Sequence, residues 1–297
     1  MCIEEGICMV QITCKDKINQ NKKINDGKVQ ITLRKIFHPI MLGLASTKVK
    51  YKIVKENKFV GVANRPIIFA VNHSNSQDIP IACKAIKKHG YLLIGKQPLE
   101  FLDELFFKLN GVVFVDRKDK EDTRLSKDAM VSYLKNGVNI IMFPEGTWNM
   151  TDQQLIMNMK WGIIDIAKES NAQIIPVILD YDKKKKKCHV KFGDSMLVDK
   201  KTDKKEAIGE LRDRMASLRW SFINENILHK RENLDVDALR KGIHDEIYEY
   251  PKLDYEYEKS VVYNPVPPAE EVFAPIKKLG IRKNTAFMYG KNKKGNW

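Results

Sequence analysis

Three absences narrow the interpretation of this sequence. The 297 residues include five cysteines, an odd number without C-x-x-C spacing; we therefore expect no disulfide framework, no metal site and a reducing compartment. No run approaches the ~20 apolar residues that a membrane-spanning helix needs, and the N-terminus lacks the pattern of a secretory signal. A G-x-S-x-G motif, typical of hydrolases that form an acyl-enzyme, is missing as well.

Acidic side chains are the minority charge, with 38 Asp and Glu against 52 Lys and Arg, a formal net charge of +14. This balance predicts an anionic partner, which can be a nucleic acid, an anionic lipid surface or an acidic carrier. Because the aromatic-rich strand motifs of single-strand binders are missing, we expect no nucleic acid partner. With 43% apolar residues, the chain can bury a sizeable core, and one main α/β domain is the natural domain count.

Short apolar segments alternate with helical patterns along the middle of the chain. The predicted strands are 67–71, 91–94, 112–115, 138–143 and 174–179. The predicted helices between them are 79–88, 99–109, 123–135 and 159–169. This alternation is typical of a mostly parallel central sheet flanked by helices on both faces.

The flanking segments have their own patterns. Segment 48–54 predicts an edge strand, five lysines at 183–187 predict a hairpin tip before a strand at 188–192, and 204–228 predicts a long helix. The lysine tip is interpreted as a solvated turn or as a docking site for lipid headgroups. The expected organisation is an N-terminal segment over 1–47, a main domain over 48–230 and a C-terminal helical and extended tail over 231–297.

The N-terminal segment contains one candidate for membrane contact, 31–46. It carries Arg34 and Lys35, a proline break at Pro39 and a short apolar run after it. Basic amphipathic helices of this kind lie in the plane of a membrane interface. The same pattern also fits a helix packed on the domain's own core.

The most informative stretch is Asn72 to Asp78, directly after the predicted strand 67–71. A histidine here, His73, can take a proton from a hydroxyl near neutral pH, and Asp78 can hold its tautomer and stabilise the imidazolium. Asp78 also precedes a predicted helix, where it can act as an N-cap while facing the histidine. The pair therefore predicts a general base and the residue that orients it.

Three further polar segments follow other predicted strands. Their candidate residues are Lys96 after 91–94, Asp116 and Arg117 after 112–115, and Glu145, Gly146, Thr147 and Trp148 after 138–143. The carboxyl ends of parallel strands meet at one edge of a sheet. We therefore expect these residues to gather with His73.

Segments 72–78, 111–117, 143–148 and the proline-containing 174–178, in this order, resemble the four sequence blocks of the glycerophospholipid acyltransferases. They are most similar to those of the bacterial 1-acylglycerol-3-phosphate acyltransferases, over residues 65–180. The resemblance implies one-step transfer of an acyl group from acyl-CoA or acyl carrier protein to a lysophospholipid, with no other cofactor. It also implies a membrane-binding N-terminal helix, so we expect a peripheral protein on the cytoplasmic face of the cell membrane, in contact with anionic lipid.

Each remaining site residue has an expected role. Arg117 can hold phosphate in a bidentate fork, Lys96 adds positive charge, and Glu145 can accept bonds from acceptor hydroxyls. Gly146 allows close backbone approach in the loop that Thr147 continues. By resemblance, Pro176 shapes the substrate pocket.

Trp148 departs from the family pattern, which usually has an arginine that is thought to hold the acceptor's phosphate. An indole has no charge and one donor, so it does not replace a guanidinium. The acceptor is therefore lysophosphatidate held without that arginine, or another lysolipid such as an amino-acid lipid precursor. A non-catalytic membrane-binding protein is the alternative from another class, and the intact His73, Asp78 and Glu145 argue against it.

Overall fold

A computed structural model of the chain describes residues 26–47, 49–95, 101–149, 154–183 and 185–225, together with 235, 237 and 241. The strands are β1 Lys52–Lys55, β2 Ile67–Val71, β3 Gly90–Gly95, β4 Val112–Val115, β5 Asn139–Met142, β6 Gln173–Asp182, β7 Lys187–Phe192 and β8 Met196–Leu197. They form one eight-stranded sheet in the order β1-β7-β6-β2-β5-β3-β4, with β8 beside β6. All pairings are parallel except those of β6 with β7 and β8. The predicted mostly parallel sheet is confirmed.

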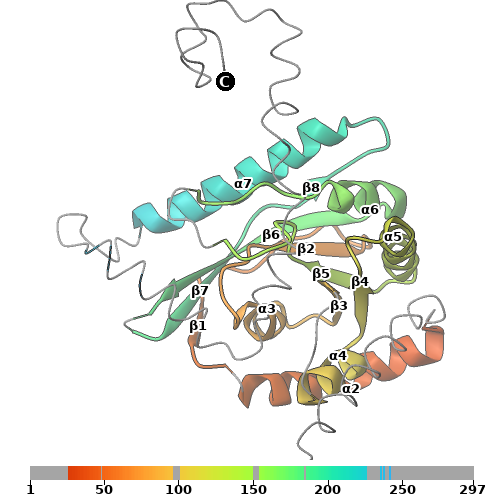
Figure 1. Ribbon diagram of the computed structural model, residues 1–297, viewed down its shortest axis with the longest axis horizontal. Coiled ribbons are helices and arrows are strands. Elements are labelled where there is room, and N and C mark those ends of the chain that lie inside the picture. Colours follow the sequence, from red (N-terminus) through yellow and green to blue (C-terminus); the bar gives the residue numbers. More distant parts are fainter. Residues whose placement is uncertain are drawn as a thin grey trace, which may run out of the picture. The chain divides into compact units, whose positions relative to one another are not determined.

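Helices cover both faces of this sheet (Figure 1). They are α2 Lys28–Thr47, α3 Asp78–Ile86, α4 Phe101–Asn110, α5 Lys120–Lys135, α6 Gly162–Ser170 and α7 Lys204–Glu225. Side chains of one sheet face, such as Ala70 and Ile140, form a buried cluster with α5, α6 and α7. Those of the other face, such as Phe69 and Ile141, pack with α3 and α4. The strands are nearly continuous apolar runs because both of their faces are buried.

Helix α2 packs outside α3 and α4 as an outer layer. The helix runs through Pro39 without ending there, so the predicted break is wrong. Proline removes one backbone hydrogen bond, but Met41 and Ala45 beyond it are buried against the domain and hold the second half in line. The opposite face of α2 is apolar and exposed, with relative exposures between 48% and 69% at Val29, Leu33, Ile36, Phe37, Ile40 and Leu44.

Among the described residues, no helix is both long enough and apolar enough to cross a membrane. The α2 helix therefore carries its exposed apolar stripe without being a candidate span. Its predicted position in a membrane interface stays a prediction.

Pro176 lies inside β6, next to Ala70 of β2. Its carbonyl accepts a bond of 2.9 Å from the backbone N–H of Gly193, where the chain passes from β7 to β8. The nitrogen of Pro176 faces the same side, toward the gap between β7 and β8. The N–H that proline lacks would point into this gap, so no hydrogen bond between β6 and β2 is lost.

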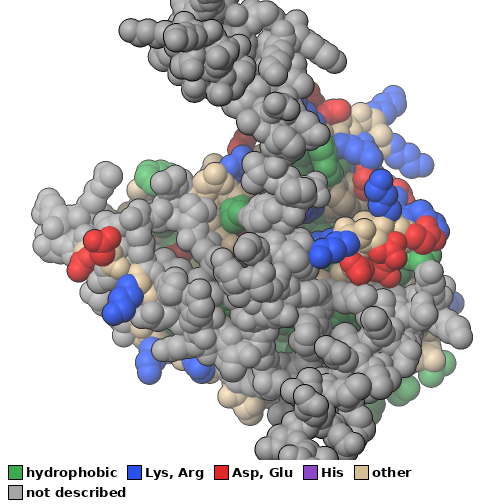
Figure 2. Space-filling view, in the orientation of Figure 1, with side chains coloured by type: hydrophobic (Ala, Val, Ile, Leu, Met, Phe, Trp, Pro, Cys, Tyr) green, Lys and Arg blue, Asp and Glu red, His purple; other side chains and the backbone are tan. Residues whose placement is uncertain are grey.

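Charge is unevenly distributed on the described surface. Basic and acidic side chains are intermixed on the side where Figure 1 shows α5 and α6 (Figure 2), and several form ion pairs, such as Lys127 with Glu169 at 2.7 Å. Several lysines instead lie together at the predicted hairpin between β6 and β7. Lys52 of the edge strand joins them because it pairs with Lys187. We call Lys52, Lys185, Lys186 and Lys187 the lysine edge.

The predicted domain boundary near residue 230 and the expected tail over 231–297 fall almost entirely outside the described residues. Both stay predictions.

Candidate active site

The site begins where β2 ends. His73 follows β2 by two residues, and its Nδ1 lies 2.8 Å from Oδ2 of Asp78. The Asp78 side chain is fully buried and that of His73 is 17% exposed. With Nδ1 donating to Asp78, Nε2 is the unprotonated nitrogen and can accept a proton. The geometry is that of an oriented general base.

The Asp78 carboxylate is held from several directions. Oδ2 also accepts from the backbone N–H groups of Ser74 at 2.6 Å and Asn75 at 2.8 Å, and Oδ1 accepts from the hydroxyl of Tyr181. Asp78 is the first residue of α3 and its carboxylate turns back to the preceding loop, so the predicted N-cap is wrong: the cap position is Gln77, without a side-chain cap bond. Four donors thus fix the position and the plane of this buried carboxylate.

Glu145 connects the loop that carries His73 to a second loop. Its Oε1 accepts from the backbone N–H of His73 at 2.9 Å, and its Oε2 accepts from that of Met157 at 2.7 Å. Burial raises the pKa of Glu145, and the N–H groups of Met157 and His73 oppose this rise. Both oxygens therefore support the fold of the site, while a contact with acceptor hydroxyls stays a prediction.

Aromatic rings enclose the imidazole. The ring of Phe143 lies 4.4 Å from that of His73 between centroids, and the ring of Trp148 lies at 5.8 Å in an edge contact. The backbone N–H of Asn149 donates to the carbonyl of His73 at 2.6 Å. Trp148 thus lies beside His73, in the loop expected to bind the acceptor.

Arg117 reaches the same loop from the end of β4. One of its guanidinium nitrogens, Nη1, donates to the carbonyl of Gly146. Gly146 has a backbone φ of +77°, a region that glycine adopts at little cost. Thr147 continues this loop and is half-buried. The expectation that the strand-end residues gather is therefore met for His73, Arg117 and Glu145; their roles toward substrate stay predictions.

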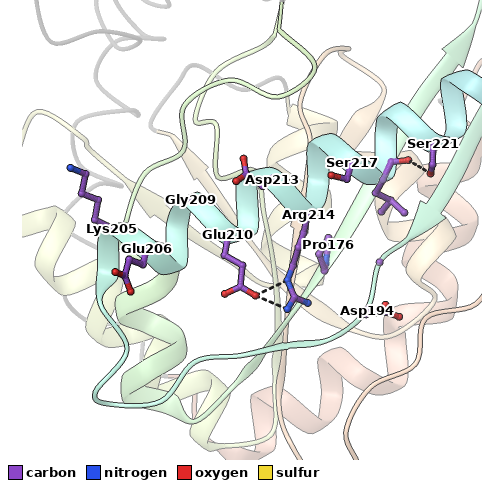
Figure 3. A pocket seen from close by; sticks show the side chains of 12 residues that line it. Pro176, Asp194, Lys205, Glu206, Gly209, Glu210, Asp213, Arg214, Ser217 and Ser221 are labelled. Carbon is purple, nitrogen blue, oxygen red and sulfur yellow. Dashed lines mark hydrogen bonds and ion pairs between the residues drawn. The ribbon is translucent and has the colours of Figure 1, made fainter.

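Two expected residues lie elsewhere. Lys96 is outside the described residues. Pro176 lines a cavity of about 810 Å³ between β6 and α7, together with Gly193, Leu218 and polar side chains of α7 (Figure 3). His73 and Asp78 are not part of that lining, and the role of Pro176 in shaping the substrate pocket stays a prediction.

Sequence reasoning missed three residues that support the site. Asn72 exchanges two bonds with the backbone of Leu179, at 3.1 and 2.7 Å, Asn149 binds the His73 carbonyl, and Tyr181 binds Asp78. Tyr181 had a signal, because it lies near the end of β6 as His73 does near the end of β2. Tyr181 follows the predicted strand 174–179 by two residues, but it was assigned to the lysine hairpin and so was not considered as a site residue.

Comparisons with known proteins agree with this geometry. Residues 50–180 match the protein family described as Acyltransferase. Residues 50–180 carry an acyltransferase domain. The chain is 29% identical over 155 residues to a 1-acyl-sn-glycerol-3-phosphate acyltransferase of Saccharomyces cerevisiae, covering 50% of this chain and 48% of that protein. It is likewise 29% identical over 140 residues to an uncharacterized acyltransferase of Schizosaccharomyces pombe, covering 46% of this chain and 50% of that protein.

The acyltransferase domain also has a solved structural neighbour. The crystal structure of the 1-acyl-sn-glycerophosphate acyltransferase of Thermotoga maritima matches with a TM-score of 0.53 and 16% identity, covering 72% of this chain and 92% of that one. This likeness establishes the fold. The chain spans about half the length of the two yeast relatives.

Proposed function

We propose that this protein transfers a fatty acyl group from a thioester donor, acyl-CoA or acyl carrier protein, to the hydroxyl of a lysophospholipid, with lysophosphatidate as the first acceptor. His73 Nε2 takes the hydroxyl proton while the oxygen attacks the thioester carbonyl carbon. The carbon–sulfur bond then breaks, and the leaving thiolate takes the proton from the imidazolium. The products are an ester and a free thiol.

The observation that carries this proposal is the contact between His73 and Asp78. A buried carboxylate on Nδ1 leaves Nε2 as the base, and the His73 side chain is 17% exposed. Positioned proton transfer of this type contributes roughly 10² to 10⁴-fold to a rate. The relatives named as acyl-glycerol-phosphate acyltransferases support this chemistry.

Direct transfer without an acyl-enzyme fits the cysteines of the described chain. Cys83 and Cys188 are both buried. Burial raises the pKa of Cys83 to about 12 and that of Cys188 well above its ordinary value. A thiol must be a thiolate to attack, so neither is an activated nucleophile.

Trp148 favours a second candidate acceptor. In this proposal Arg117 and Lys96 supply the positive charge for a phosphomonoester, and the indole beside His73 adds none. An aromatic side chain at this point also suits a lysolipid with a bulkier headgroup, such as an amino-acid lipid precursor. The two acceptors differ in charge, so variants of Arg117 and Trp148 separate them.

Peripheral attachment to an anionic membrane, on its cytoplasmic face, is the proposed location. The exposed apolar stripe of α2 supplies a surface that can enter the acyl boundary. The lysine edge lies at the start of β1, the strand that follows α2 along the chain. Each lysine near an anionic surface contributes about 1 kcal/mol.

The assay that tests this function is thiol release from palmitoyl-CoA and from palmitoyl-acyl carrier protein, with and without lysophosphatidate. The expected result is release that depends on the acceptor, with phosphatidate formed in equal amount. Thiol release that no lysolipid stimulates contradicts acyl transfer and favours a non-catalytic lipid-binding protein or a thioesterase.

A further inference from the structure

Tyr181 binds the carboxylate oxygen of Asp78 that does not contact His73. Strand β6 continues past its last residue paired with β2, Val177, and carries Tyr181 into the part paired with β7. There the tyrosine hydroxyl donates to Oδ1 of Asp78, while Oδ2 accepts from His73 and from the two loop N–H groups. Tyr181, Asp78 and His73 thus form one chain of hydrogen bonds.

We propose that Tyr181 is a positioning residue of this acyltransferase: its hydroxyl fixes the Asp78 carboxylate and limits the negative charge that Asp78 presents to His73. The inference rests on the proposed role of His73 as the base. A carboxylate bonded at both oxygens has a fixed plane, so it holds the imidazole in one orientation. The two carboxylate oxygens share one delocalised negative charge, so a donor at Oδ1 draws part of that charge away from the contact at Oδ2.

The surroundings keep Tyr181 in place as a donor. Its ring packs edge-on against Tyr51, with 4.9 Å between ring centroids. Burial raises the pKa of Tyr181 well above its ordinary value, and the Asp78 charge raises it further. The hydroxyl is therefore protonated across the working pH range of a histidine base.

A second link ties the same corner to the N-terminal layer. The backbone N–H of Lys50, next to Tyr51, donates to Oε1 of Gln77 at 2.9 Å, and Gln77 precedes Asp78. The start of α3 is thus held by two independent contacts, one from Tyr181 of β6 and one from the backbone of Lys50. These contacts keep the Asp78 carboxylate at one angle to the His73 imidazole, as catalysis by an oriented base requires.

The test is Tyr181→Phe, which keeps the ring and its contact with Tyr51 and removes the hydroxyl. We expect kcat to fall roughly tenfold, the factor that corresponds to losing one hydrogen bond to a charged group, with smaller changes in KM for donor and acceptor. We also expect the acid limb of the kcat/KM profile to move to higher pH. Without the Tyr181 donor, Asp78 presents more charge and stabilises the imidazolium.

Tyr91→Phe is the matched control. Tyr91 is also a strand tyrosine that donates to a carboxylate, with its hydroxyl 2.7 Å from Oδ2 of Asp26, but that carboxylate does not contact His73. The control is expected to lose a comparable hydrogen bond and to keep the wild-type pH profile. A Tyr181→Phe enzyme with wild-type kcat and an unmoved acid limb overturns the inference.

A substrate-free measurement separates this inference from the proposed function. The imidazole of His73, assigned by comparison with His73→Ala, is titrated by ¹⁵N NMR in the wild type and in Tyr181→Phe. The expected result is a higher titration midpoint in the variant, and equal midpoints overturn the inference. A wild type that acylates no lysolipid, with the midpoint still shifted, removes the proposed function and leaves the coupling of Tyr181 to His73 standing.

Discussion

Two histidines in the described chain contact carboxylates, and only their positions distinguish them. His73 lies 2.8 Å from Asp78 and His189 lies 2.6 Å from Glu56. His189 sits within strand β7, with its ring against Phe222, whereas His73 sits in a loop after a strand end. A histidine–carboxylate pair is therefore not a site by itself. His73 differs from His189 because a second loop surrounds it, through contacts from Glu145, Asn149 and Trp148.

The acceptor contact is tested by Arg117→Ala. Losing a charge-assisted contact typically costs about 1.5 to 3 kcal/mol, so KM for lysophosphatidate is expected to rise roughly ten- to a hundredfold while KM for the acyl donor changes much less. Steady-state kinetics with each substrate varied in turn measures both constants. Equal rises in the two constants would argue against a specific contact with the acceptor's phosphate.

Trp148→Arg separates the two candidate acceptors. If lysophosphatidate is the natural acceptor, the added guanidinium is expected to improve its use, because it supplies a second cation for the phosphate. If another lysolipid is the acceptor, the same change is expected to lower activity on that lipid. A screen of lysolipids against wild type and variant measures this, and identical acceptor profiles would mean that position 148 does not touch the acceptor.

At the scale of elements, helix α2 is attached to the domain through two buried histidines. The rings of His38 in α2 and His89 before β3 are 5.1 Å apart, and Nε2 of His89 lies 2.8 Å from the carbonyl of Asn110. Burial lowers the pKa of both, that of His89 to about 4, and the nearby His38, Lys35 and Arg34 lower the pKa of His89 further. The contact between helix and core thus favours neutral imidazoles.

This contact predicts a loss of stability in acid. Between pH 6.5 and about 4 the unfolded chain protonates His89 and the folded chain does not. The free energy of unfolding therefore falls as pH drops through that window, and above pH 6.5 His89 causes no loss of stability. The full effect of His89 is about 3 kcal/mol. Urea unfolding at pH 7 and pH 4.5 should show a smaller loss for His89→Gln than for wild type; equal losses contradict the prediction.

The exposed stripe of α2 gives a prediction for membrane binding. Wild type is expected to sediment with anionic phosphatidylglycerol vesicles at low salt and to be partly released by high salt, because lysine–lipid attraction is screened. Burying one apolar side chain contributes about 1.5 kcal/mol or more, so replacing Ile36, Phe37 and Ile40 together by serine should weaken binding at least roughly tenfold. These side chains face solvent, and the fold is expected to survive.

A matched control uses apolar side chains exposed elsewhere. Val60, Val62 and Leu197 are exposed on loops and β8, and their replacement by serine is expected to leave vesicle binding unchanged. Equal losses in the two triple variants would contradict a specific role for α2. Binding that resists both high salt and alkaline washing would instead argue for a buried anchor.

Element boundaries show what the sequence can and cannot predict. The strands at 67–71 and 112–115 are confirmed at both ends, because a short apolar run bounded by polar residues defines a buried strand locally. Strand β6 extends to Asp182 and not to 179, because its last residues are polar and are held by pairing with β7. The two-residue β8 has no local pattern and depends entirely on β6.

At the scale of the whole molecule, sheet topology explains why the site residues could be predicted from separate segments. Strands β2, β5, β3 and β4 are parallel neighbours, so the segments after them meet at one edge. The partners of supporting side chains such as Asn72 and Tyr181 could not be predicted this way. Their contacts cross from β2 and α3 to β6, more than a hundred residues away in sequence, and no local pattern reports such pairs.

The most direct test of His73 as the general base is the turnover of His73→Ala, with His189→Ala as the matched control. Acyl transfer from palmitoyl-CoA to the best lysolipid acceptor is measured for both variants and wild type, with circular dichroism and vesicle binding as checks on the fold. His73→Ala is expected to lose acyl transfer while fold and lipid binding persist, and His189→Ala is expected to keep acyl transfer. A His73→Ala protein that retains more than roughly a tenth of wild-type turnover contradicts a general base worth at least 10²-fold.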